Sequence, residues 1–156
     1  MIAFCAHPTG NITLPTAANY NHVILPDVAP GGSDPHNGYN LGSRYDSSTG
    51  TWTPVQGEEP DALVSFAGQV WIPNAGPLGS GQNFVARIVK NGYPGGTTVG
   101  AAIASKGPFA NDWVITLSMQ DLAVAGDEYG LYVFTQIAPA IIDGHPLHTF
   151  WNGKVG

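Results

Sequence analysis

Charged residues make up only 10% of this 156-residue chain, against roughly 25% in ordinary soluble domains. The formal net charge is −6, and the basic residues are just Arg44, Arg87, Lys90, Lys106 and Lys154. Binding to nucleic acid, or to an anionic membrane surface, requires a clustered basic face. The sequence therefore argues against nucleic acid as a direct partner and against attachment to an anionic membrane.

Long apolar runs and cysteines are also lacking. No run approaches the roughly 20 residues that a membrane-spanning helix needs, so we expect no membrane insertion. Residues 1–8 lack the basic segment and longer apolar stretch of a secretory signal, which predicts a protein that acts where it is made or leaves by assembly or lysis. Cys5 is the only cysteine, which excludes an intrachain disulfide, and its apolar neighbours favour a buried, unreactive thiol.

Good helix formers are scarce, whereas turn formers abound. The chain contains 21 glycines and 13 prolines, the two poorest helix residues, which excludes a helical bundle or a coiled coil. Hydrophobic residues make up 43%, enough for the core of one domain over residues 1–156. We therefore predict a single all-β domain.

Short apolar segments separated by turn signals predict the strands of an antiparallel jelly roll or sandwich. They cover residues 2–6, 20–25, 44–46, 51–53, 62–72, 84–90, 97–105, 113–119, 129–136 and 149–155. Gly68, inside one long run, suggests a bulge. The segment 129–136 is apolar on both faces, so it is either sandwiched or at a subunit contact. Residues 27–38 form a long loop suited to a surface or interface role.

Four stretches resemble, in order, motifs of the complement component 1q-type globular head, whose fold is the ten-stranded jelly roll of tumour necrosis factor. They are RYDSSTGTWTPV at 44–55, VARIVKNG at 85–92, LAVAGDEY at 122–129 and HTFWNGKV at 148–155. The resemblance assigns structural roles to Tyr45, Asp46, Gly50, Trp52, Asn91, Gly92, Gly126, Asp127 and Phe150. The chain departs from the pattern in the 27–38 insertion, in the lengthened segment 56–60, and in lacking a collagen stalk.

The resemblance implies a compact homotrimer in which aromatic and aliphatic side chains pack around a three-fold axis. We expect Tyr132, Phe134 and Trp151 at this interface.

Catalytic patterns are weak, and we predict that the protein is not an enzyme. No serine lies in a Gly-x-Ser-x-Gly sequence. Glu58 and Glu59 are adjacent, so on a strand they would face opposite ways and could not work as an acid–base pair. His145 and His148 flank a proline and are expected to be ordinary surface histidines.

No cofactor is expected, and calcium is the one metal left open. Asp27, Asp34 and Asp46 carry oxygen ligands that suit calcium, but their spacing matches no calcium loop.

The leading functional hypothesis is a virion structural protein: a trimeric knob, such as a capsid decoration, head spike or fibre tip, on the surface of a bacteriophage-like particle. Residues 1–38 would dock it to other virion proteins, and Asp34, His36 and Tyr39 are the predicted ligand or docking residues of the long loop. The alternative is a receptor- or glycan-binding module that attaches to a host surface through exposed Trp and Tyr. A small hydrolase is a third, disfavoured hypothesis, because no acid–base pair is evident.

Overall fold

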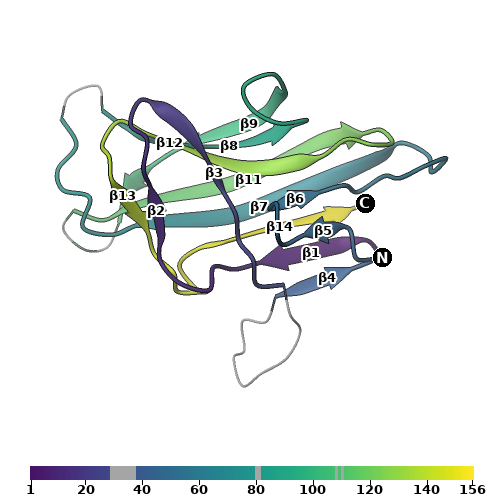
Figure 1. Cartoon of the computed structure of the whole chain (residues 1–156), viewed down its shortest axis with the longest axis horizontal. Coiled ribbons are helices and arrows are strands. Elements are labelled where there is room, and N and C mark those ends of the chain that lie inside the picture. Colours follow the sequence, from purple (N-terminus) through teal and green to yellow (C-terminus); the bar gives the residue numbers. More distant parts are fainter. Residues whose placement is uncertain (29–37, 80–81, 108, 110) are drawn as a thin grey trace.

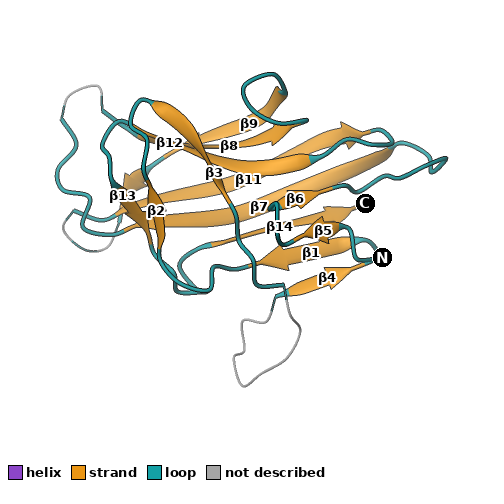
Figure 2. Ribbon diagram, viewed as in Figure 1, coloured by secondary structure: helices purple, strands orange, loops and turns teal. Residues whose placement is uncertain are grey.

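The computed structural model describes residues 1–28, 38–79, 82–107, 109 and 111–156. Within these ranges every regular element is a β-strand and every pairing is antiparallel, as Figure 2 shows. The prediction of an all-β antiparallel chain is therefore confirmed. The described residues also contain no helix long and apolar enough to cross a membrane.

Two sheets pack face to face, and a third, small sheet closes one end (Figure 1). The first sheet has the order β10 (Ser105–Lys106), β11 (Trp113–Ala123), β7 (Ala62–Ile72), β14 (Phe150–Val155), β1 (Ala3–Ala6) and β4 (Tyr39–Leu41). The second has the order β5 (Tyr45–Asp46), β6 (Thr51–Trp52), β12 (Tyr129–Thr135), β8 (Phe84–Lys90) and β9 (Thr97–Ile103), with β3 (Asn19–Val23) also paired to β12. The small sheet pairs β2 (Ile12–Leu14) with β13 (Ala140–Ile142).

Alternation along the long strands explains why the sheets pack. On β7, Val64, Phe66 and Val70 point inward and are buried, while Ser65, Ala67 and Gln69 face out. β11 repeats this alternation, whereas β12 is buried along almost its whole length, and each sheet contributes one apolar face to the core.

The centre of the core is aromatic. Phe4 on β1 stacks on Tyr45 with ring centroids 4.6 Å apart and meets the ring of Trp151 edge-on at 4.6 Å. A side chain at Gly153 would collide with Phe4 and Trp52, because a Cβ there would lie 2.7 Å and 2.8 Å from their rings. The glycine in this strand is therefore required by packing.

The described chain holds fourteen strands, so the predicted count of ten was too low. The additional strands, β2, β4, β10 and β13, have only two or three residues each. β4 and β10 are the edge strands of the first sheet, and β2 and β13 pair with each other. Gly68 does not mark a bulge, since β7 pairs without interruption on both sides. A Cβ at Gly68 would instead lie 2.7 Å from the carbonyl oxygen of Phe150, which explains the glycine. The bulge in the sandwich lies at Ile88/Val89.

The N-terminal segment is built into the sandwich. β1 lies between β14 and β4, and β3 pairs with β12. The two chain ends lie side by side (Figure 1), with Val155 N donating to Ile2 O at 2.9 Å. Docking through residues 1–38 stays a prediction, and of these residues 29–37 are outside the described ranges.

Candidate functional site

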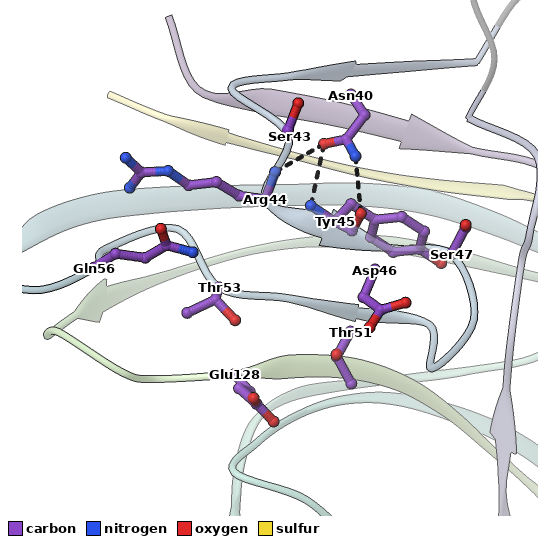
Figure 3. Close-up of a pocket in the computed structure, with 10 residues that line it drawn as sticks. All are labelled: Asn40, Ser43, Arg44, Tyr45, Asp46, Ser47, Thr51, Thr53, Gln56 and Glu128. Carbon is purple, nitrogen blue, oxygen red and sulfur yellow. Dashed lines mark hydrogen bonds between the residues drawn. The ribbon is translucent and has the colours of Figure 1, made fainter.

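A polar cavity of about 520 Å³ opens where the turns of the first motif meet the turn before β12, and we call it the turn pocket (Figure 3). Its lining is almost entirely polar: Asn40, Ser43, Arg44, Tyr45, Asp46, Ser47, Thr51, Thr53, Gln56 and Glu128. Most of these residues lie within the first motif, residues 44–55, which therefore forms most of the pocket.

Asn40 organises one wall of the turn pocket. Its Oδ1 accepts hydrogen bonds from the backbone N–H groups of Arg44 and Tyr45, both at 3.1 Å, and its Nδ2 donates to Tyr45 O at 2.8 Å (Figure 3). The amide replaces the backbone partners that a tight turn cannot supply. Ser43, with a φ of 54°, lies in the same turn. The Asn40 side chain is thus committed to the fold.

The charge of Arg44 is also used internally. Its guanidinium forms two hydrogen bonds of 2.5 Å with the carboxylate of Glu59 and a third, at 2.6 Å, with Pro54 O. These bonds from Arg44, together with one from Gln56 N, lower the pKa of Glu59 to about 2. The Arg44–Glu59 pair therefore holds the lengthened segment 56–60 against the first motif.

The first motif has a structural explanation. Asp46 Oδ1 accepts from Ser48 N at 2.8 Å and from Ser48 Oγ at 2.6 Å, which shapes the turn that Gly50 completes with a φ of 69°. Tyr45 and Trp52 are buried, and the Tyr45 hydroxyl donates to Leu25 O at 2.9 Å. The four predicted residues of this motif are therefore brought together, as a hairpin and its core anchors.

The second and third motifs meet at the far end of the second sheet. The Asn91 side chain donates to Asp127 Oδ1 and accepts from Glu128 N, each at 3.0 Å. Gly92 and Gly126 take φ values of 79° and 88°, which favour glycine in these two turns. These residues hold the turn after β8 next to the turn before β12.

Chemically, the turn pocket offers hydroxyls, an amide and two exposed carboxylates, those of Asp46 and Glu128. Its lining includes no histidine or cysteine, and it presents no nucleophile paired with a base. The arrangement suits hydrogen bonding to a polar ligand rather than catalysis.

A second feature is a group of rings on the outer side of the second sheet, which we call the aromatic face. It consists of Tyr20, His22, Tyr93, Tyr132 and Phe134. His22 stacks on Tyr132 with centroids 4.5 Å apart, and Tyr20 lies 5.3 Å from Phe134 and 5.2 Å from Tyr93. Tyr132 is only 9% exposed, since rings of its own chain already cover it. The sequence prediction missed Tyr20, His22 and Tyr93, although Tyr20 and His22 are two residues apart on a predicted strand and so share one face.

Trp151 does not lie with Tyr132 and Phe134. It faces the core, is 0% exposed, and contacts Phe4 and Tyr45. Along β14 the side chains alternate between the core and the outside, and Trp151 is on the core side. The prediction that its side chain lies at a subunit interface is therefore corrected. Tyr132 and Phe134 do face outward, and their role between subunits stays a prediction.

His22 makes folding stability sensitive to mild acid. Burial lowers its pKa from the ordinary 6.5, only partly offset by a hydrogen bond with the backbone of Gly50. The unfolded chain then binds the proton more readily, so stability should fall as the pH drops below about 6.5. We expect His22→Phe, which keeps the stacking on Tyr132, to flatten the pH dependence of the urea midpoint between pH 7 and pH 5. An unchanged slope would show that His22 does not titrate in this range.

The ligand or docking site of the long loop stays a prediction. Asp34 and His36 lie outside the described residues. Tyr39, on β4, is 37% exposed, and Phe150 is half-buried on the outer side of β14. Burial raises the pKa of the Cys5 thiol to about 11, which agrees with an unreactive cysteine.

Metal ligands do not converge in the described part of the chain. No group of three His, Cys, Asp or Glu side chains there could hold an ion. Asp27 pairs with His7 through backbone bonds, and Asp46 is occupied by its turn. The rings of His145 and His148 lie 4.8 Å apart, with Asp143 next to His148 at 3.3 Å. Calcium binding therefore gains no support from the described aspartates.

Solved structures share this arrangement of strands. The chain superimposes on murine APRIL with a TM-score of 0.62 at 11% identity, over 97% of this chain and 96% of that one. It matches Eiger TNF from S. frugiperda with a TM-score of 0.60 at 13% identity (99% and 90% covered) and the zebrafish complement 1qA globular domain with 0.56 at 11% identity (99% and 96% covered).

The fold is a jelly roll like those of tumour necrosis factor and complement component 1q. No protein-family model matches the chain, and no curated protein matches its sequence. The structural matches establish the jelly-roll fold, and because the sequence identities are only 10–13%, they establish nothing finer.

Proposed function

We propose that this protein is a non-enzymatic, homotrimeric surface knob of a bacteriophage-like particle that acts by adhesion. Three rigid jelly rolls would present three copies of each loop and outer face to a repetitive surface, and so convert weak single contacts into avidity. The proposal needs a surface through which the copies associate.

The outer side of the first sheet supports such a contact, and this observation carries the proposal. We call the outward positions of β7, β11 and β14 the uncharged face, because Lys154 is their only charged residue. Subunit interfaces are depleted in charged side chains at their centre. A sheet face of this breadth that is exposed to solvent would normally carry several charged side chains.

The composition of the uncharged face suits close approach of a second copy. At its centre Ala67 lies opposite Ser118 on one side and Asn152 on the other, so small side chains leave the sheet flat. At its edge Leu63 and Leu122 lie directly opposite each other and are 50% and 56% exposed. Covering these leucines would stabilise the assembly by removing apolar surface from water.

The aromatic face is the other candidate contact, as the sequence predicted for Tyr132 and Phe134. Its rings already pack on one another within one chain, so it has less to gain from a second copy.

Two matched substitutions distinguish these surfaces. Ala67→Glu places a carboxylate on the uncharged face, and Ala101→Glu places the same charge on the exposed outer side of β9. We expect light scattering at micromolar concentration to give three times the 16.3 kDa chain mass for the natural protein and for Ala101→Glu, but the mass of one chain for Ala67→Glu.

A monomeric natural protein would contradict the trimer. A trimer that survives Ala67→Glu but dissociates on Phe134→Asp would place the contact on the aromatic face instead. The assignment to a particle is tested separately, by mass spectrometry of purified particles: the chain should be present in a copy number divisible by three.

The second candidate function is attachment to a host-surface glycan. The turn pocket favours it, because hydroxyls such as those of Ser43 and Thr53 and the exposed Glu128 carboxylate can bind sugar hydroxyl groups there.

A further inference from the structure

Arg87 lies at the centre of the aromatic face, on β8. Its guanidinium carbon lies 4.3 Å from the centroid of the Tyr20 ring, a cation–π distance. Tyr93, which is 37% exposed, follows β8 and folds back beside Tyr20. A cation and two partly exposed ring faces are thus held together on one outer surface.

The charge of Arg87 is not neutralised within the described chain. The ion pairs among those residues engage Arg44 and Lys90, but none engages Arg87. Its Nε atom has no hydrogen-bond partner. The neighbour directly opposite on β9 is Ala101, which offers no acceptor side chain. In a protein with a net charge of −6, the Arg87 guanidinium thus contacts an aromatic ring but no described carboxylate.

We propose that Arg87, Tyr20 and Tyr93 form a binding site for a carboxylated sugar, of the uronic or sialic acid class. The guanidinium would bind the sugar carboxylate through paired hydrogen bonds. The C–H groups on one face of the sugar ring carry slight positive charge and would lie on the electron-rich faces of the tyrosines. The inference rests on the adhesive function proposed above and names a ligand class for it.

Other ligands fit this surface less well. A peptide added as a β-strand would pair with a free sheet edge, but β8 and β12, which carry Arg87 and Tyr132, are each paired on both sides. A nucleic acid needs several clustered cations, whereas Arg87 is the one basic residue among these rings. A sugar unit that carries one carboxylate matches the single cation and the two ring faces that the surface presents.

The test uses isothermal titration of the natural protein with an oligogalacturonate of defined length, and with maltohexaose as the neutral comparison. We expect saturable binding of the acidic oligosaccharide only. Arg87→Gln should weaken it about tenfold or more, because a hydrogen-bonded charge pair is lost. Lys106→Gln removes an equal charge from the exposed edge strand β10, away from both proposed surfaces, and should leave the affinity unchanged.

Ala101→Glu provides a second, independent variant. A carboxylate opposite Arg87 should pair with the guanidinium and compete with the sugar, so this variant should also bind at least several-fold more weakly. The absence of saturable acidic-sugar binding, equal binding of maltohexaose, or an equal loss in Lys106→Gln would each overturn the site.

The mass of every sample, measured by light scattering, keeps the two proposals apart. A trimer without sugar binding would overturn the site alone, whereas a monomer that binds the acidic sugar through Arg87 would overturn the trimer alone. A change of mass in Arg87→Gln would place the aromatic face between subunits and also overturn the site.

Discussion

Replacing Trp151 by alanine is expected to destabilise the jelly roll by about 3–5 kcal/mol, the usual cost of truncating a fully buried large aromatic side chain. The Trp151 ring is 0% exposed and lies 4.6 Å from Phe4 and 6.2 Å from Phe66, so its loss would leave a cavity between the sheets. Because the free energy of unfolding of a domain is only about 5–15 kcal/mol, this substitution would remove a large part of it. Urea unfolding at fixed protein concentration measures the effect.

Lys106→Ala, at an exposed position of the edge strand β10, is the control and should change stability by less than about 0.5 kcal/mol. The experiment also distinguishes two positions for Trp151. If the ring lay at a subunit contact, Trp151→Ala would dissociate the assembly and leave a well-folded single chain. Dissociation without loss of chain stability would therefore contradict the core position.

Replacing Asp127 by alanine is expected to cost about 2–4 kcal/mol, since the carboxylate holds two turns and one strand together. Its Oδ2 accepts from Val124 N at 2.9 Å, its Oδ1 accepts from the Asn91 side chain at 3.0 Å, and Lys90 Nζ lies 3.2 Å away. Removing the acceptor would leave a backbone N–H and an amide without partners in a partly buried place. Glu128→Ala, an exposed neighbour, should have little effect.

Acid unfolding provides a second measurement of Asp127. Burial alone would raise its pKa, but the hydrogen bonds from Val124, Asn91 and Lys90 outweigh it and hold the pKa below the ordinary 3.8. The stabilisation is thus complete at neutral pH and is lost as the pH falls below about 3.8 and through the lowered value. Asp127→Asn should therefore show a smaller loss of stability below pH 4 than the natural protein, and an identical loss would contradict this role.

Much of the fold follows from local pattern. Two predicted segments, 62–72 and 84–90, coincide with β7 and β8, because alternating or apolar runs bounded by turn residues define a strand locally. The motif residues Tyr45, Asp46, Asn91 and Asp127 each form a turn or anchor one, which is also a local property. The missed strands β2, β4, β10 and β13 have only two or three residues, too few to show a period.

The sequence by itself determined an antiparallel β-domain with low charge, one free thiol and glycine-rich turns, because composition and short-range periodicity decide these properties. The tertiary structure alone decided which side of each strand faces the core. Trp151 and Phe134 both lie on apolar strands, yet one is enclosed and the other faces out, since a shift of one residue in register exchanges the two faces. The meeting of Tyr20 with Arg87 and Tyr93 was equally hidden, because β3 and β8 are far apart in the sequence and only the pairing of β12 with both strands brings them together.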